Sequence, residues 1–116
     1  MSLQIDIEEI EKRIILRLNG RLDAATSPIL EKKILKLVEE KRTDLLLDFS
    51  NVDYLSSAGL RLLLSSTKKL HSLKGNLVLF SLAAEVEEII KMAGFDRILH
   101  IFADEKEALQ HRHPSK

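Results

Sequence analysis

One stretch of the chain decides the fold, and it reads Leu45-Leu-Leu-Asp-Phe-Ser-Asn-Val-Asp-Tyr-Leu-Ser-Ser-Ala-Gly-Leu60. It predicts an apolar strand over Leu45–Phe49, then a short polar loop, then a helix that opens at a serine pair. The small residues behind that pair leave backbone N–H groups open to solvent, and a helix start carries partial positive charge. A hydroxyl there can accept a phosphoryl group, which the helix N-terminus would stabilise.

Two strands are predicted ahead of this stretch. Leu3–Ile7 alternates apolar and polar residues, and Arg13–Leu18 is a second strand, with Asn19-Gly20 as a turn signal. The charged piece at 8–12 turns the chain between them, which predicts a hairpin. Ser27, as N-cap, and Pro28 then begin a helix.

The second half of the chain continues the alternation. We expect a helix from Ser57 to Lys74 capped by Gly75, a strand over Asn76–Phe80 and a helix over Ala84–Ala93 with Val86, Ile89 and Ile90 inward. A strand over Arg97–Phe102 and a short helix follow, the helix opened by a capping box of Asp104 and Glu107. The predicted class is α/β, in the order β-β-α-β-α-β-α-β-α, with helices packed against a mixed sheet.

Composition excludes several classes of function. The 116 residues carry equal numbers of acidic and basic side chains, and 4% are aromatic, which argues against nucleic-acid binding. No apolar run is long enough to insert in a membrane, and the absence of cysteine fits a cytoplasmic protein without a disulfide or thiolate site. We expect a single domain over residues 1–110, with a flexible tail at 111–116, and no metal or cofactor, because His111 and His113 make a weak ligand set.

Several motifs, in order, resemble the STAS domain family, and in particular its stand-alone bacterial anti-sigma factor antagonists. The resemblance rests on Leu47–Val52, on Ser57-Ala-Gly-Leu60, on Gly20-Arg-Leu-Asp23 and on Met92–Ile98, and it extends from Leu3 to about Gln110. It implies a binding switch and not an enzyme. An anti-sigma factor that is also a serine/threonine protein kinase would bind the unmodified domain and release its sigma factor. The kinase would then phosphorylate the antagonist, and a phosphatase would reset it.

Carried onto this chain, the resemblance makes Ser57 the phosphoacceptor. Ser56 stands where the family often has aspartate, which makes it a rival acceptor, and Arg61 stands where glycine is frequent. From the residues alone, Ser57 is interpreted as an N-cap hydroxyl. The two roles are compatible, because the unmodified hydroxyl can cap the helix and the phosphorylated one can bind its amides. We predict partner contacts around this junction, at Asp23, Asp53, Tyr54, Ser56, Ala58, Gly59 and Arg61.

Other interpretations remain open at this level. Asp23 is equally a turn or capping carboxylate, and Asp48, inside an apolar strand, is best explained as a structural carboxylate. The alternative function is an STAS interaction module of a stress-sensing assembly or of a lipid-transport complex. A hydrolase that uses Ser57 is disfavoured, because there is no Gly-x-Ser-x-Gly elbow and no histidine close in sequence.

Overall fold

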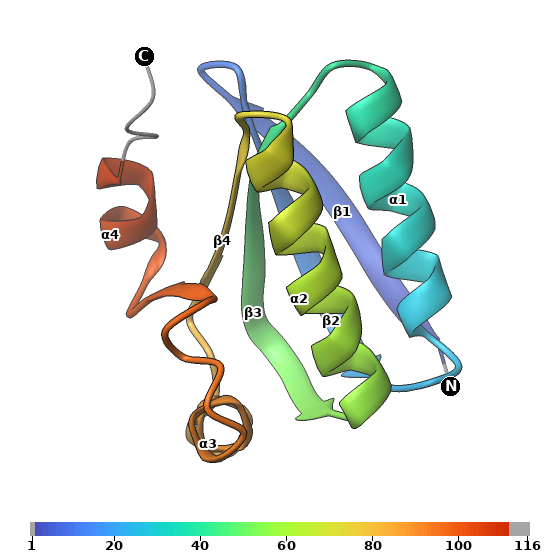
Figure 1. The fold of residues 1–116 in the computed structure, drawn as a ribbon, viewed down its shortest axis with the longest axis vertical. Coiled ribbons are helices and arrows are strands. Elements are labelled where there is room, and N and C mark those ends of the chain that lie inside the picture. The colour runs from blue at the N-terminus through green and yellow to red at the C-terminus, as the bar shows by residue number, and fades with distance from the viewer. Residues whose placement is uncertain (1, 112–116) are drawn as a thin grey trace.

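A computed structural model describes residues 2–111, and its centre is a five-stranded sheet in the order β1-β2-β3-β4-β5 (Figure 1). The first two strands are antiparallel and the other neighbours are parallel, which confirms the predicted mixed sheet. The strands are β1 (Leu3–Ile10), β2 (Arg13–Leu22), β3 (Asp44–Leu55), β4 (Asn76–Phe80) and β5 (His100–Phe102). The helices are α1 (Ser27–Glu39), α2 (Ser57–Ser72), α3 (Ala84–Met92) and α4 (Glu105–Gln110).

The hairpin turns at residues 11 and 12, whose φ angles are 50° and 72°. The predicted turn at Asn19-Gly20 is wrong, because both residues belong to β2. Gly20 has a φ of +137° and lies where the pairing of β2 with β3 shifts register. A Cβ there would be 2.7 Å from the carbonyl oxygen of Ser2, so glycine permits close approach within a bulged strand rather than a turn.

Two further strand boundaries differ from prediction. β3 continues to Leu55, where a loop was expected, because its second half pairs with the end of β2 through Asn19–Asn51 and Leu22–Leu55. β5 begins only at His100, because residues 97–99 form a turn in which the carbonyl of Phe95 accepts from the amides of Ile98 and Leu99.

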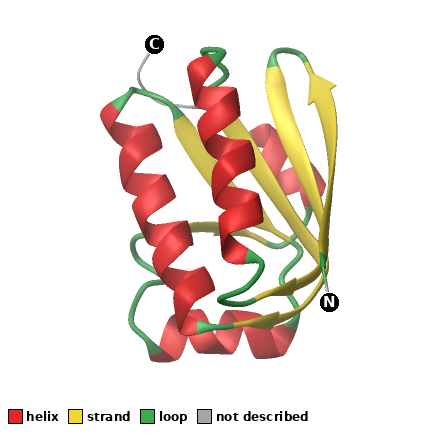
Figure 2. Cartoon of the chain, turned by 90° about the vertical axis from the view of Figure 1, so that its right-hand side faces the viewer, coloured by secondary structure: helices red, strands yellow, loops and turns green. Residues whose placement is uncertain are grey.

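Helices cover both faces of the sheet (Figure 2). α1, α2 and α3 bury the larger apolar cluster, which includes Leu16, Leu30, Leu47, Leu63 and Ile90. The opposite face has a smaller cluster beneath α4, made by Ile15, Leu46, Val78, Phe80 and Ala108. Side chains alternate between the two faces of a strand. Because both faces of the central strands are covered by helices, the sequences of these strands are nearly continuous apolar runs.

The helix ends refine the predictions. The N-cap of α1 is Thr26 and not Ser27, which is the first helical residue. At the end of α2, Lys74 takes the left-handed conformation (φ 62°), and the amide of Gly75 donates to the carbonyl of Leu70. Gly75 is therefore not the left-handed residue itself, and its lack of a side chain accommodates the nearby backbone of Thr43.

The last two helices agree with prediction in type. In α3, Val86 and Ile90 are buried as expected, but Ile89 is 37% exposed. Asp104 accepts a hydrogen bond from the amide of Glu107 (2.9 Å), which confirms it as the N-cap of α4. Apart from His111, the tail expected at 111–116 lies outside the described residues.

Candidate functional site

The end of β2 and the start of α2 are joined by backbone contacts. The amide of Ser56 donates a hydrogen bond to the carbonyl of Leu22 (2.9 Å). A Cβ on Gly59 would lie 2.7 Å from that same oxygen and 2.9 Å from Cδ1 of Leu55, so only glycine allows this approach. The β2–α1 loop and the start of α2 consequently lie at one end of the sheet, the lower end in Figure 1.

The two serines at this junction have different surroundings. Ser56 is half-buried and is the N-cap of α2, where its Oγ accepts a hydrogen bond from the amide of Gly59 (3.1 Å). Ser57 is exposed and is the first helical residue. The N-cap role predicted for Ser57 is therefore wrong by one residue. The amides of Ser57 and Ala58 precede the first intrahelical hydrogen bond, which Leu60 donates to Ser56.

Asp23 organises the loop between β2 and α1. Its carboxylate accepts hydrogen bonds from the amides of Ala25 and Thr26 (3.0 Å each). The hydroxyl of Thr26 accepts from the amide of Asp23 (2.9 Å) and donates to the carbonyl of Arg21 (2.7 Å). The bond from the Thr26 amide, chief among these contacts, lowers the pKa of Asp23. Both amides precede α1, whose N-cap is Thr26, so Asp23 is a turn carboxylate and not a helix cap. Its contact with a partner stays a prediction.

Arg21 joins the neighbouring strand ends. Its guanidinium lies 4.2 Å from the centre of the Tyr54 ring, and its Nε is 3.7 Å from a carboxylate oxygen of Asp23. The sequence prediction included Tyr54 and Asp23 but missed Arg21. Arg21 belongs to the motif Gly20-Arg-Leu-Asp23, but the approach of Arg21 to Tyr54 depends on the register shift between β2 and β3. Asp53, beside Tyr54, is exposed at the end of β3.

A groove of about 560 Å³ runs between α1 and α2. Its lining includes Ala24 from the β2–α1 loop, Ala58 and Arg61 from the first turns of α2, and Glu31 and Lys68 further along the two helices. Arg61 is exposed. The predicted site residues thus fall into two adjoining parts. Asp23 and Tyr54 lie at the joined strand ends, and Ala58 and Arg61 line this groove.

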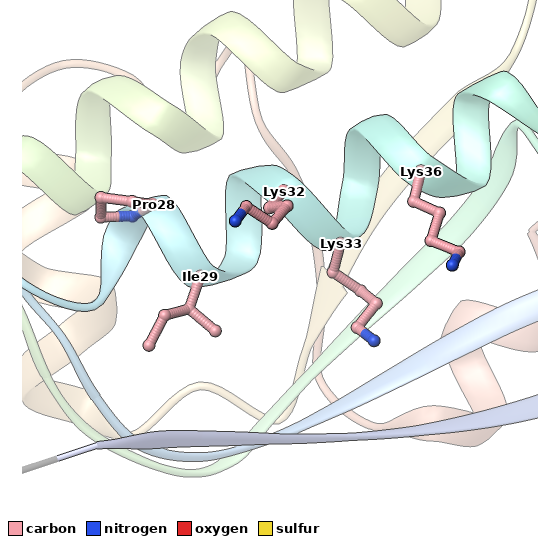
Figure 3. Close-up of a pocket in the computed structure, with 5 residues that line it drawn as sticks. All are labelled: Pro28, Ile29, Lys32, Lys33 and Lys36. Atoms are coloured by element: carbon pink, nitrogen blue, oxygen red, sulfur yellow. The ribbon is translucent and has the colours of Figure 1, made fainter.

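A second groove, of about 430 Å³, lies along α1 and adjoins the first groove at Pro28, which lines both. Figure 3 shows that its lining residues, Pro28, Ile29, Lys32, Lys33 and Lys36, all come from α1. None of the predicted site residues contributes to it. Its three lysines make this stretch of α1 basic.

Asp48 has a structural role. It is 8% exposed, and its carboxylate contacts Nη1 of Arg17 (2.9 Å) and accepts from the amide of Ser50 (2.9 Å). Arg17 also contacts Glu8 and Glu105 (2.7 and 2.9 Å), and the hydrogen bond to Glu105, the largest contribution, raises the pKa of Arg17. The structure therefore confirms the structural interpretation of Asp48.

Residues 2–111 contain no cluster of three or more His, Asp or Glu side chains that could hold a metal ion. His111 lies 5.0 Å from Phe102 and 6.1 Å from His100, ring centre to ring centre, while His113 falls outside the described residues. Within the described part of the chain, no helix is both long and apolar enough to cross a membrane.

The fold and the junction define a class of protein, an α/β domain with an exposed serine at the start of α2. The chain belongs to the STAS domain family, whose model matches residues 4–108. It is 32% identical over 106 residues to BtrV of Bordetella bronchiseptica, to which an anti-sigma factor antagonist role is attributed, covering 91% of this chain and 90% of that protein. It is 26% identical over 110 residues to the anti-sigma F factor antagonist of Paenibacillus polymyxa, covering 94% of each. These names describe antagonists of another protein rather than enzymes, as predicted.

Solved structures show the same fold. An anti-sigma factor antagonist from Mycobacterium paratuberculosis superposes with a TM-score of 0.84 at 23% identity, covering 93% of this chain and 92% of that one. The Bacillus cell fate determinant SpoIIAA in its phosphorylated form gives a TM-score of 0.70 at 20% identity, covering 92% and 97%. At this level of identity, the two likenesses concern the fold alone.

Proposed function

We propose that this protein is an anti-sigma factor antagonist, and that it binds an anti-sigma factor that is also a serine kinase, at the surface formed by the β2–α1 loop and the start of α2. Capture of that partner would free a sigma factor. The observation that carries the proposal is the exposed hydroxyl of Ser57 at the start of a helix, at the same end of the sheet as the hydrogen-bonded β2–α1 loop, in a chain related to named antagonists.

Ser57 is the phosphoacceptor in this proposal. Its side chain is exposed, whereas the rival Ser56 is half-buried and its hydroxyl is engaged with the amide of Gly59. A phosphate on Ser57 would lie near the amides of the first turn, where the helix dipole favours an anion. SpoIIAA, which shares this fold, has been solved in a phosphorylated form, and this supports the proposal that the present chain is phosphorylated.

Phosphorylation would act on binding rather than on folding. It adds about −1.5 to −2 units of charge at neutral pH, in the middle of the proposed surface. A partner that buries this point against acidic or apolar groups would lose affinity, about tenfold for each 1.4 kcal/mol. Asp23, Asp53, Tyr54, Ser56, Ala58 and Arg61 would supply the surrounding contacts, whereas the buried Gly59 would only set the position of the helix start. A phosphatase would restore the binding form.

The test uses the full-length protein as bait in its source organism, in wild-type, Ser57→Ala and Ser57→Asp forms. We expect the wild type and Ser57→Ala to retain an anti-sigma factor, and Ser57→Asp to lose at least tenfold in affinity for the purified partner. Incubation with that partner and ATP should add one phosphoryl group to Ser57 by mass spectrometry. Ser72→Asp, an exposed serine at the other end of the same helix, is the matched control and should bind normally. Full-strength binding by Ser57→Asp would contradict the proposal.

A further inference from the structure

One side of α1 is both apolar and basic. The positions that share this side follow the three-and-four spacing of a helix, and they are Ile29, Lys32, Lys33 and Lys36. With Pro28 they line the groove of about 430 Å³ (Figure 3). Ile29 is 43% exposed, and no acidic residue contributes to the lining. We call these five residues the basic face of α1.

One side of α3 has the opposite charge. Its residues repeat the same spacing and are all exposed, and they are Glu85, Glu88, Ile89 and Met92. At 79%, Met92 is the most exposed large apolar side chain among the described residues. The other side of the helix packs on the larger apolar cluster, so these four residues are not needed for the core. We call them the acidic face of α3.

Neither face has its charges neutralised within the chain. No ion pair among the described residues includes a lysine of the basic face or a glutamate of the acidic face. The ion pair on α3 joins Glu87 and Lys91, which lie outside the acidic face. In Figure 1, α1 lies at the right of the molecule and α3 at the lower left, so the two faces do not meet in one chain.

The two faces are complementary in charge and in apolar content. Contact between them would bring three lysines to two glutamates and would remove Ile29, Ile89 and Met92 from water. The lysine stems are themselves apolar and extend the groove around Ile29. An exposed apolar side chain surrounded by charge is typical of an interaction surface, and here the matching surface belongs to the same protein.

We propose that a second copy of this chain docks the acidic face of its α3 on the basic face of α1. The interface is heterologous, because it joins two different patches, so association produces short chains of molecules and not a closed dimer. Both patches are small, which makes the association weak and transient. The proposal does not depend on the function proposed for Ser57, because none of its residues belongs to the proposed partner surface.

The test is sedimentation velocity of the full-length protein from micromolar to millimolar concentration at low ionic strength. We expect the weight-average sedimentation coefficient of the wild type to rise with concentration. It should return toward the monomer value in about 0.5 M sodium chloride, because salt screens exposed charge pairs. The variants Lys32→Gln/Lys36→Gln and Glu85→Gln/Glu88→Gln each remove one face, and each alone should remain monomeric where the wild type associates.

Mixing the two variants gives the sharper result. The lysine variant keeps its acidic face and the glutamate variant keeps its basic face, so a mixture can form one interface and should stop at a heterodimer. With the glutamate variant ¹⁵N-labelled, two-dimensional NMR should show shifts of the amides of Ile29 and Lys33 and none in α3.

The matched control is Lys68→Gln/Lys69→Gln, which removes two exposed lysines from α2 and should associate as the wild type does. Equal weakening by this control would overturn the proposal, because the effect would then be one of general surface charge. A wild type that stays monomeric at millimolar concentration would overturn it too, and would leave the basic face to an acidic partner of another kind. So would a mixture that fails to associate, or one that shifts α3 of the labelled variant.

Discussion

Ser56 and Ser57 are neighbours in sequence, but they differ in what their hydroxyl groups do. Ser56 accepts a hydrogen bond from Gly59 and its backbone amide is bound to Leu22, so it fixes the start of α2. Ser57 extends into solvent one residue later. One serine therefore serves the fold, and the other is available for modification.

This difference predicts unequal effects of alanine substitution. Ser56→Ala removes the N-cap side chain and should lower the free energy of unfolding by about 1 kcal/mol. Ser57→Ala should change it by less than about 0.5 kcal/mol, because an exposed residue away from any cap contributes little. Urea denaturation of the two variants makes the comparison, and each serves as the control for the other. Equal losses would mean that the two hydroxyl groups share the capping role.

Asp23 predicts a pH dependence of stability. Hydrogen bonds from the β2–α1 loop lower its pKa in the folded state, first among them the one from the Thr26 amide. A carboxyl group whose pKa is lower in the folded state stabilises the protein at pH values above its unfolded pKa of about 3.9. This stabilisation is lost as the pH falls through the pKa of the folded state. Asp23→Asn should therefore reduce the drop in the urea unfolding midpoint as the pH falls below about 4. An unchanged acid profile in urea titrations of this variant would contradict the assignment.

At the scale of elements, α4 is the shortest described helix, with six residues and one buried side chain, Ala108. Two arginines of β2 hold it to the sheet. Arg17 contacts Glu105 (2.9 Å), and Nη1 of Arg13 donates to the carbonyl of Leu109 (2.9 Å). Polar contacts, as well as apolar packing, thus determine where this helix lies.

Arg17→Met tests that attachment. The variant keeps an apolar stem but leaves the nearly buried Asp48 without its cation, so we expect a loss of about 1–3 kcal/mol in the free energy of unfolding. Amide hydrogen exchange in α4 should accelerate, while exchange in α2 should not change locally. The control is Arg42→Met, which removes a partly exposed ion pair with Glu9 and should cost less than about 1 kcal/mol. Unchanged exchange in α4 would show that packing alone holds it.

At the scale of the whole molecule, the proposed partner surface and the core are separate. β2, β3 and α2 are joined by buried leucines and backbone hydrogen bonds, whereas Ser57 and Arg61 point to solvent. A new charge on this surface therefore need not disturb the scaffold.

Ser57→Asp makes this separation measurable. We expect the free energy of unfolding to stay equal or to rise by about 0.3–1 kcal/mol, because a carboxylate at a helix start favours the dipole. The NMR spectrum should change only near the start of α2. If the variant were unfolded or markedly less stable, its loss of partner binding would be a folding effect, and urea denaturation of the free protein would reveal it.

The sequence by itself determined the order of elements, because period-two and helical apolar patterns are local, as is the capping of α4 by Asp104. Tertiary contacts decided the rest. β3 extends through Asp53 and Tyr54 because β2 pairs with it there, and Gly20 forms a bulge and not a turn for the same reason. Ser56 became the cap, and Arg21 came to lie against Tyr54, because the chain returns from β3 beside the end of β2. Such contacts join residues more than thirty positions apart, and no local pattern specifies their register.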